Sequence, residues 1–305
     1  MTIETPFKIV RPLEMRLEVG QFVIDGESAP LPLEGEGGLH ALIGQLSALF
    51  PHRECDAQGN VTRVFDDRHA VAAEAPGLLR FAFGPTKDVG EIRVELETFQ
   101  RELSRMLEAA GLRSVVVGSL APEGEQAAPH AATNVGIERA DGILPDSACA
   151  LAEAAAPLLA LLGDNTPAPA DAGHIVHART LDEANRAIEF DGSRLTLHVA
   201  DALPAPFATA FATLAKGLLA TDESLETAQN ILGKPCQADI AQAWEAIGYG
   251  GFEATIYGKS AHELADALIE CACTTLATNE HNYLVPLRHL VRTRKTLTMM
   301  GRTQR

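Results

Sequence analysis

The sequence lacks the signals that most quickly assign a chain to a class. It has no run of about 18 apolar residues, the length that a membrane-spanning helix needs. Its opening residues, MTIETPFKIVRP, lack the apolar core of a signal peptide. Basic residues are in deficit, because 25 Lys and Arg stand against 41 Asp and Glu, a net charge of −16. We therefore expect a cytoplasmic protein that binds neither nucleic acid nor membranes, since this charge repels their phosphates.

The short motifs of common enzyme classes are also absent. There is no Walker loop, no G-x-G-x-x-G after a strand, no G-x-S-x-G elbow and no H-E-x-x-H. The five cysteines form no C-x-x-C pair, and their odd number favours free thiols over a disulfide framework. Any function must therefore be inferred from the order of strands and helices and from the polar residues on them.

Hydrophobic patterning predicts an α+β fold, with a mostly antiparallel sheet that helices cover on one face. Alternation of polar and apolar residues predicts strands over residues 15–25, 60–67, 78–84, 130–138 and 193–204, and a buried strand over 112–122. Helical spacing predicts helices over 39–50, 88–110, 147–162 and 205–220. We expect one domain over residues 1–305, with a helical C-terminal part from about residue 223. A parallel α/β sheet is the alternative, but only SVVVG is typical of its strands.

Polar residues on the predicted strands are the candidates for chemistry. Glu14, Arg16 and Glu18 alternate, so they share one face of the first strand. Carboxylates on a sheet can hold Mg²⁺; the alternative is a solvent-facing ladder of paired charges. His130 and Asn134 flank a later strand, and both can donate to an oxyanion or ligate a metal.

Further candidates lie in the second half of the chain. Arg179 follows His174 and His177 and could bind a carboxylate or phosphate through two hydrogen bonds. His198 and Asp201 face opposite ways on a strand, which argues against a catalytic His–Asp pair. A transition metal held by histidines is a further hypothesis, although ten histidines in 305 residues are no enrichment. Residues 281–305 are basic and contain no acid, which indicates a solvated tail or a phosphate-facing segment.

The order of these segments resembles the glutamate–cysteine ligase family, in its bacterial carboxylate–amine ligase branch. RLEVGQFVID resembles the opening strand, and LLRFAFGPTKDVGEIRVELETFQRELSRMLEAAGLRSVVVGSLAP resembles the strand, long helix and strand that follow. ATNVGIE, AAPLLALLGDNTP, GHIVHAR and RLTLHVADALP then continue in the family's order. The resemblance spans roughly residues 14–222 and implies a glutamine synthetase-like fold.

The resemblance implies an ATP- and Mg²⁺-dependent ligase that forms an amide bond on an amino acid, of γ-glutamyl type, through an acyl phosphate. It implies a small amino acid as substrate, and it is compatible with a homo-oligomer. The residues that it assigns to catalysis are Arg179, His198 and Asn134, those assigned to the nucleotide are Glu18, Gln21 and Arg80, and those assigned to Mg²⁺ are Glu18 and Glu14.

Several positions depart from the family's pattern, while Arg179 and Asp201 keep it. The departures are Val19 and Gln21 at two glutamates, Ala82 at a glutamate, Ala132 and Asn134 at two histidines, and Thr196 and His198 at a glutamate and an arginine. Mg²⁺ usually takes one or two protein carboxylates. The alternative is therefore a catalytically degenerate relative, which uses the same cleft to bind a small molecule, a peptide or a protein partner.

Overall fold

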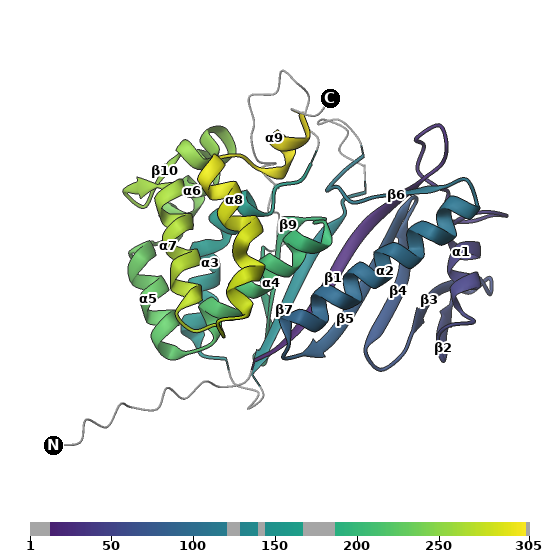
Figure 1. The fold of residues 1–305 in the computed structure, drawn as a ribbon, viewed down its shortest axis with the longest axis horizontal. Coiled ribbons are helices and arrows are strands. Elements are labelled where there is room, and N and C mark those ends of the chain that lie inside the picture. The colour runs from purple at the N-terminus through teal and green to yellow at the C-terminus, as the bar shows by residue number, and fades with distance from the viewer. Residues whose placement is uncertain (1–12, 121–128, 140–143, 167–186, 303–305) are drawn as a thin grey trace.

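The computed structural model describes residues 13–120, 129–139, 144–166 and 187–302, and a large antiparallel sheet organises them (Figure 1). Its order is β2-β3-β4-β5-β1-β7-β9-β8, and β6 pairs with β1 on the same side as β7, beyond the start of β7. The strands are β1 (Leu13–Ile24), β2 (His52–Cys55), β3 (Val61–Phe65), β4 (His69–Ala75), β5 (Leu78–Thr86), β6 (Arg113–Val115), β7 (Ala132–Arg139), β8 (Ile188–Phe190) and β9 (Arg194–Asp201). The prediction of an α+β fold with a mostly antiparallel sheet is confirmed.

Helices α2 and α4 lie across one face of the sheet, and the other helices of the second half stack beside β9 (Figure 1). The helices are α1 (Leu39–Leu46), α2 (Val89–Ala109), α3 (Asp146–Leu162), α4 (Ala205–Leu219), α5 (Asp222–Leu232), α6 (Gln237–Gly250), α7 (Ala261–Cys273), α8 (Val285–Thr293) and α9 (Leu297–Arg302). A small hairpin, β10 (Thr255–Ile256) and β11 (Lys259–Ser260), packs on α6. In the described part of the chain, no helix has the length and apolar character needed to cross a bilayer.

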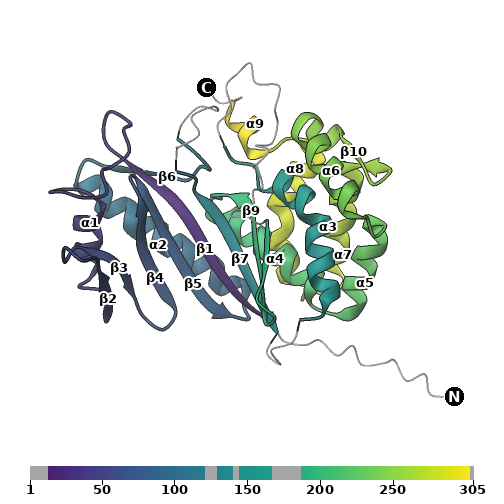
Figure 2. The ribbon, with the colours of Figure 1, turned by 180° about the vertical axis from the view of Figure 1, so that it is seen from behind.

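The alternation of β1 sorts its side chains between the core and the opposite face. Leu13, Met15 and Leu17 are buried in the core beneath the helices. Glu14 and Glu18, between and beyond them, point to the other side. Among the described elements, no helix covers β1, β4 and β5 on that side (Figure 2), which we call the open face. The sheet therefore has an apolar face that holds the helices and a polar face available for chemistry.

The predicted helix over 88–110 corresponds closely to α2, which buries five apolar residues and is followed by Gly111 at φ +71°. Pro157 lies inside α3 without ending it. The predicted buried strand over 112–122 is confirmed only over β6, Arg113–Val115, which is not buried, and residues 121 and 122 lie outside the described residues. After β6, residues 116–120 leave the sheet and cover one end of the open face, where Val116, Val117 and Leu120 pack against an apolar cluster that includes Phe22.

The close packing of α4 on α7 gives a stability prediction. A Cβ added at Gly217 would lie 2.6 Å from Ala272 Cβ and 2.7 Å from its carbonyl oxygen. We expect Gly217→Ala to lower the free energy of unfolding by about 1–3 kcal/mol, measured by urea denaturation. In α1, a Cβ at Gly44 would meet nothing within 4 Å. Gly44→Ala should therefore stabilise by about 0.5–1 kcal/mol. Equal effects of the two substitutions would contradict this packing.

Candidate functional site on the open face

Strand pairing aligns polar positions from four strands in rows across the open face. In one row, Glu18 on β1 lies opposite Asn134 on β7. In the next, Arg16 lies opposite Gly136 on β7, which lies opposite Thr196 on β9. The open face also carries Ala82, opposite Glu18 on β5. The positions at which the sequence departs from the ligase pattern, apart from Val19 and Gln21, thus gather on this face.

The carboxylate of Glu18 is held by two donors. Its Oε2 accepts a hydrogen bond from Arg80 Nη1 at 3.0 Å and another from Asn134 Nδ2 at 3.2 Å. Arg80 also donates through Nη2 to Glu74 at 2.8 Å. The Glu18 side chain is 41% exposed, so its carboxylate is reachable while its charge is compensated.

Asn134 is nearly buried beside Glu18, with 5% of its surface exposed. Its amide nitrogen must face the carboxylate, since an amide oxygen there would be repelled. The orientation leaves Asn134 Oδ1 buried, without a hydrogen-bond partner among the described residues. A buried acceptor of this kind is normally satisfied by a water or by a donor group of a ligand.

Arg16 is the neighbouring cation on the open face. It is exposed, and no described residue forms an ion pair with it. The absence of a side chain at Gly136 leaves room for two stems, because a Cβ there would lie 3.3 Å from Arg194 Cδ and 3.5 Å from Arg16 Cβ. Arg194 itself donates to Glu138 at 3.5 Å. The Arg16 guanidinium is thus a cation available for an anionic group.

The second predicted metal ligand lies away from the first. Glu14 and Glu18 are four positions apart on one strand face, which corresponds to about 13 Å between their Cα atoms. Glu14 Oε1 is also 3.4 Å from Lys87 Nζ. The structure therefore does not bring these two carboxylates to one ion. Within the described ranges, no group of three or more His, Cys, Asp or Glu residues is arranged to hold a metal.

The other predicted residues are placed as follows. Gln21 lies opposite Leu79 on the helix side of the sheet and is 2% exposed, so it does not join Glu18. His198 shares the open face with Thr196, and its Nε2 lies 3.3 Å from Glu189 of β8. Arg179, like the two histidines before it, lies outside the described residues.

A cluster of polar contacts around Asp201, at one end of the open face, was not predicted; we call it the Asp201 cluster. Asp201, which is 5% exposed, accepts hydrogen bonds from Asn165 N and Thr166 Oγ1, both at 2.8 Å. His130 Nε2 lies 3.1 Å from its other oxygen. Asp201 therefore has a histidine partner, but from the residues just before β7 and not from its own strand. Sequence spacing could not reveal the His130–Asp201 contact, because that contact depends on the register that pairs Ala132 with Asp201.

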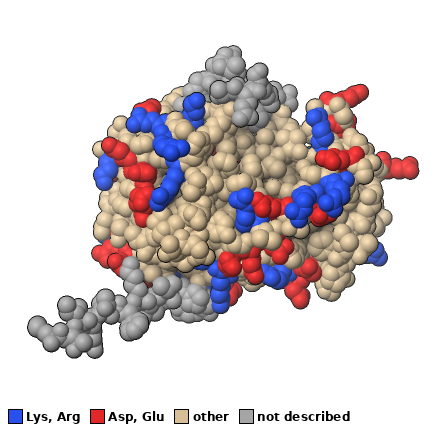
Figure 3. Space-filling view, viewed as in Figure 1, with Lys and Arg blue, Asp and Glu red and all other residues tan. Residues whose placement is uncertain are grey.

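The described part of the basic C-terminal segment, residues 281–302, lies on the helical side, away from the open face. Arg288 pairs with Glu270 at 2.8 Å, and Arg294 pairs with Glu253 at 2.8 Å. Figure 3 shows cations and acids intermixed over the helical end of the molecule. These two arginines are paired with acids, which supports a solvated charged surface there over a phosphate-facing one.

The Asp201 cluster gives a second stability prediction. Asp201→Ala leaves the backbone N–H of Asn165 and the hydroxyl of Thr166 without their acceptor in a buried place. We expect it to lower the free energy of unfolding by about 2–4 kcal/mol, measured by urea denaturation. The matched control is Asp25→Ala, because Asp25 accepts two backbone N–H bonds in an exposed turn. If Asp25→Ala lowered the free energy of unfolding as much as Asp201→Ala does, burial of the Asp201 cluster would be unimportant.

Comparison with known proteins shows the fold and leaves the family open. No protein-family profile matches the chain, and no curated protein matches it in sequence. Among solved structures, the complex of the prokaryotic ubiquitin-like protein Pup with its ligase PafA matches with a TM-score of 0.58 at 14% identity, over 97% of this chain and 69% of that one. GmaS without ligand matches with a TM-score of 0.48 at 12% identity, over 97% and 70%. The GmaS/ADP complex matches with a TM-score of 0.48 at 11% identity, over 96% and 71%. The chain thus shares its α+β, glutamine synthetase-like fold with the ligase PafA.

Proposed function

We propose that the chain binds a free α-amino acid on the open face of its sheet. The observation that carries the proposal is the pair formed by a held carboxylate, Glu18, and an available guanidinium, Arg16, on one strand face. The two residues are separated by one position, which corresponds to about 7 Å between their Cα atoms. An α-amino acid carries an ammonium and a carboxylate on one carbon, so it complements such a pair.

Each group has a physical role in this arrangement. Glu18 would accept hydrogen bonds from the ammonium, and Asn134 would hold its carboxylate in place through Nδ2. Arg16 would bind the carboxylate of the ligand through two parallel hydrogen bonds. Arg80 orients Glu18 without occupying both of its oxygens. The apolar cluster around Phe22 closes one end of the face.

The described residues fit Mg²⁺-ATP poorly. The central carboxylate already faces a guanidinium and an amide N–H, which a metal ion would have to displace. The flanking positions in the same row and the next are Ala82, Gly136 and Thr196, which offer no carboxylate oxygen. We therefore assign no catalytic step to Glu18 through a metal. This arrangement favours the catalytically degenerate alternative.

The second candidate is ATP-dependent carboxylate–amine ligation. A specific observation favours it: the chain matches the fold of the ligase PafA over 97% of its length, with a TM-score of 0.58. Arg179, the residue that the resemblance assigns to the substrate carboxylate or the phosphate, lies outside the described residues. For this candidate we propose the glutamate–cysteine ligase family, on the sequence resemblance over roughly residues 14–222. Its reaction would be amide bond formation on an amino acid.

Amino acid binding can be measured by isothermal titration calorimetry with L-glutamate and L-alanine. We expect Arg16→Gln to weaken binding by about tenfold or more, because it removes a charge-assisted pair. N-acetyl-L-glutamate lacks the ammonium and should bind the native protein correspondingly more weakly. The control is Arg105→Gln, an exposed arginine on α2, the opposite side of the sheet. Native-like affinity in Arg16→Gln, or equal affinity for the acetylated ligand, would contradict the proposal.

The two candidates differ in their response to nucleotide. A ligase should gain thermal stability with ATP and Mg²⁺ together, because a ligand that binds only the folded state raises its stability by mass action. An amino acid binder should show a rise in Tm with the amino acid and none with Mg²⁺-ATP. Release of ADP or phosphate that requires L-glutamate and an amine would establish ligation and overturn our choice between the two.

A further inference from the structure

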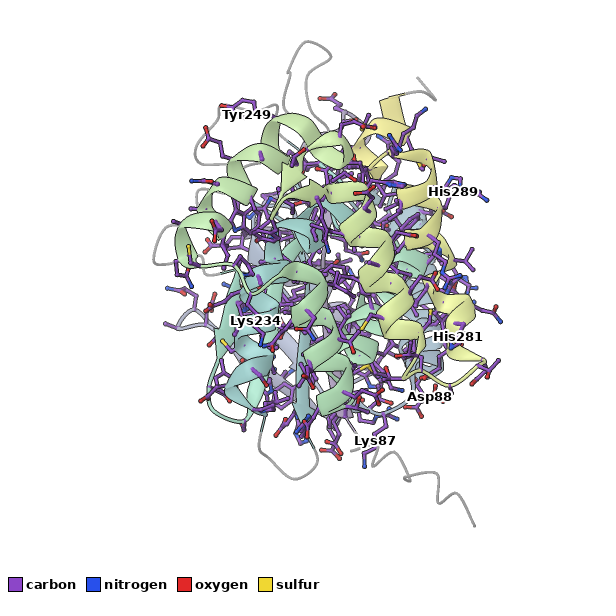
Figure 4. All side chains as sticks on the ribbon, turned by 90° about the vertical axis from the view of Figure 1, so that its left-hand side faces the viewer. Lys87, Asp88, Lys234, Tyr249, His281 and His289 are labelled. Carbon is purple, nitrogen blue, oxygen red and sulfur yellow. The ribbon has the colours of Figure 1, made fainter. Side chains whose placement is uncertain are left out.

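A cavity lies at the helical end of the molecule, between α6 and the β10–β11 hairpin. Its volume is about 570 Å³, within the range of about 300–1,000 Å³ that is usual for small-molecule sites. Figure 4 faces this end of the molecule, where Lys234, just before α6, and Tyr249, near its end, mark the two ends of the helix. Figure 1 shows α6 and β10 on the far side of the helices from β1 and β5, so the cavity is separate from the open face.

One face of α6 creates the cavity. Asp239, Gln242, Ala243 and Ala246 line it and recur at helical spacing. The two alanines are small, so the hairpin that packs there leaves a space above them. Its apolar floor includes Leu232, Ala243 and Ile256, which are buried. The cavity therefore combines an apolar floor with a polar rim.

The charge of the rim has one sign. Asp239 is the only charged residue among those that line the cavity. The Cys236 thiol and the Cys236 backbone N–H donate to its carboxylate and lower its pKa, so it is ionised at neutral pH. The cavity thus offers a fixed negative charge beside apolar surface.

Tyr257 adds an aromatic wall. Burial, and then the nearby Asp239 carboxylate, raise the pKa of its phenol, so the ring stays neutral. Its hydroxyl donates to the backbone oxygen of Ala154 in α3 at 2.9 Å, which fixes the ring against the helices. A neutral aromatic ring carries negative charge on its face and attracts cations.

We infer that this cavity is a binding site for a small organic cation, an alkylammonium group with a short apolar chain. Its ammonium pairs with Asp239 at the rim, and its chain lies on Leu232, Ala243 and Ile256. This ligand differs in charge from the amino acid proposed for the open face. The two sites are therefore tested independently, and each can fail without the other.

The test uses the full chain and three probes of matched size: n-butylammonium, n-butanol and butyrate. We expect n-butylammonium to bind, detected by the chemical-shift changes of amides in α6 and the hairpin. Butyrate and n-butanol should bind about tenfold more weakly or not at all, which is a difference of about 1.4 kcal/mol. Equal binding of the neutral and cationic probes would overturn the role of Asp239.

Two pairs of variants test the Asp239 charge and the cavity volume separately. Asp239→Asn keeps a hydrogen-bonding side chain at the start of α6 and should weaken n-butylammonium binding about tenfold, while Glu245→Gln, on α6 outside the lining, should not. Ala246→Leu fills the cavity and should abolish binding, while Ala241→Leu, at an exposed position of α6, should not. Native affinity in both Asp239→Asn and Ala246→Leu would show that the cation binds elsewhere and would overturn the inference. Arg16→Gln should leave this binding unchanged.

Discussion

The antiparallel pairing of β1 with β5 on one side and β7 on the other is the constraint on which the rest of the structure depends. β1 has 12 residues and lies at the centre of the sheet. Because side chains alternate across a strand, a shift of one residue in either register would bring Glu18 into the apolar core and expose Leu17. The cost of burying that charge fixes the register. The same register places Asn134 beside Glu18 and Arg16 over Gly136.

This dependence explains which features could be predicted from the sequence. The faces of β1 and α2 follow from local periodicity, so the α+β fold and the grouping of Glu14, Arg16 and Glu18 on one face were within reach. The partners of these side chains were not, since Arg80 and His130 meet Glu18 and Asp201 only through pairings between distant strands. The segment after β6 was misassigned for a related reason. Its valines bury their side chains against Phe22 outside the sheet, and apolar composition alone cannot distinguish that from a strand.

The ion pair at the centre of the open face decides how we interpret a fold shared with a ligase. A carboxylate with no neighbouring cation attracts metal ions, whereas one held by a guanidinium and an amide is already compensated. A ligand can still contact Glu18, whose side chain is 41% exposed, provided that it brings donors rather than a strongly hydrated ion. An ammonium meets this condition, because it can share the carboxylate with Arg80 through directional hydrogen bonds. For the proposed site, an amine therefore suits this carboxylate better than a metal ion does.

At both proposed sites the local charge selects the ligand, but the charges that surround the ligand differ between the two sites. On the open face, cations outnumber free acids around the ligand position, since Arg16 has no described acid partner and Arg80 neutralises Glu18. At α6 the only lining charge is Asp239, and the rest of the lining is apolar, aromatic or uncharged polar. An anion would be repelled at the second site, whereas at the first site Arg16 favours a ligand that brings a carboxylate together with its ammonium. A chain with a net charge of −16 can discriminate in this way because local pairing, rather than overall charge, sets the field that a small ligand meets within a few ångströms.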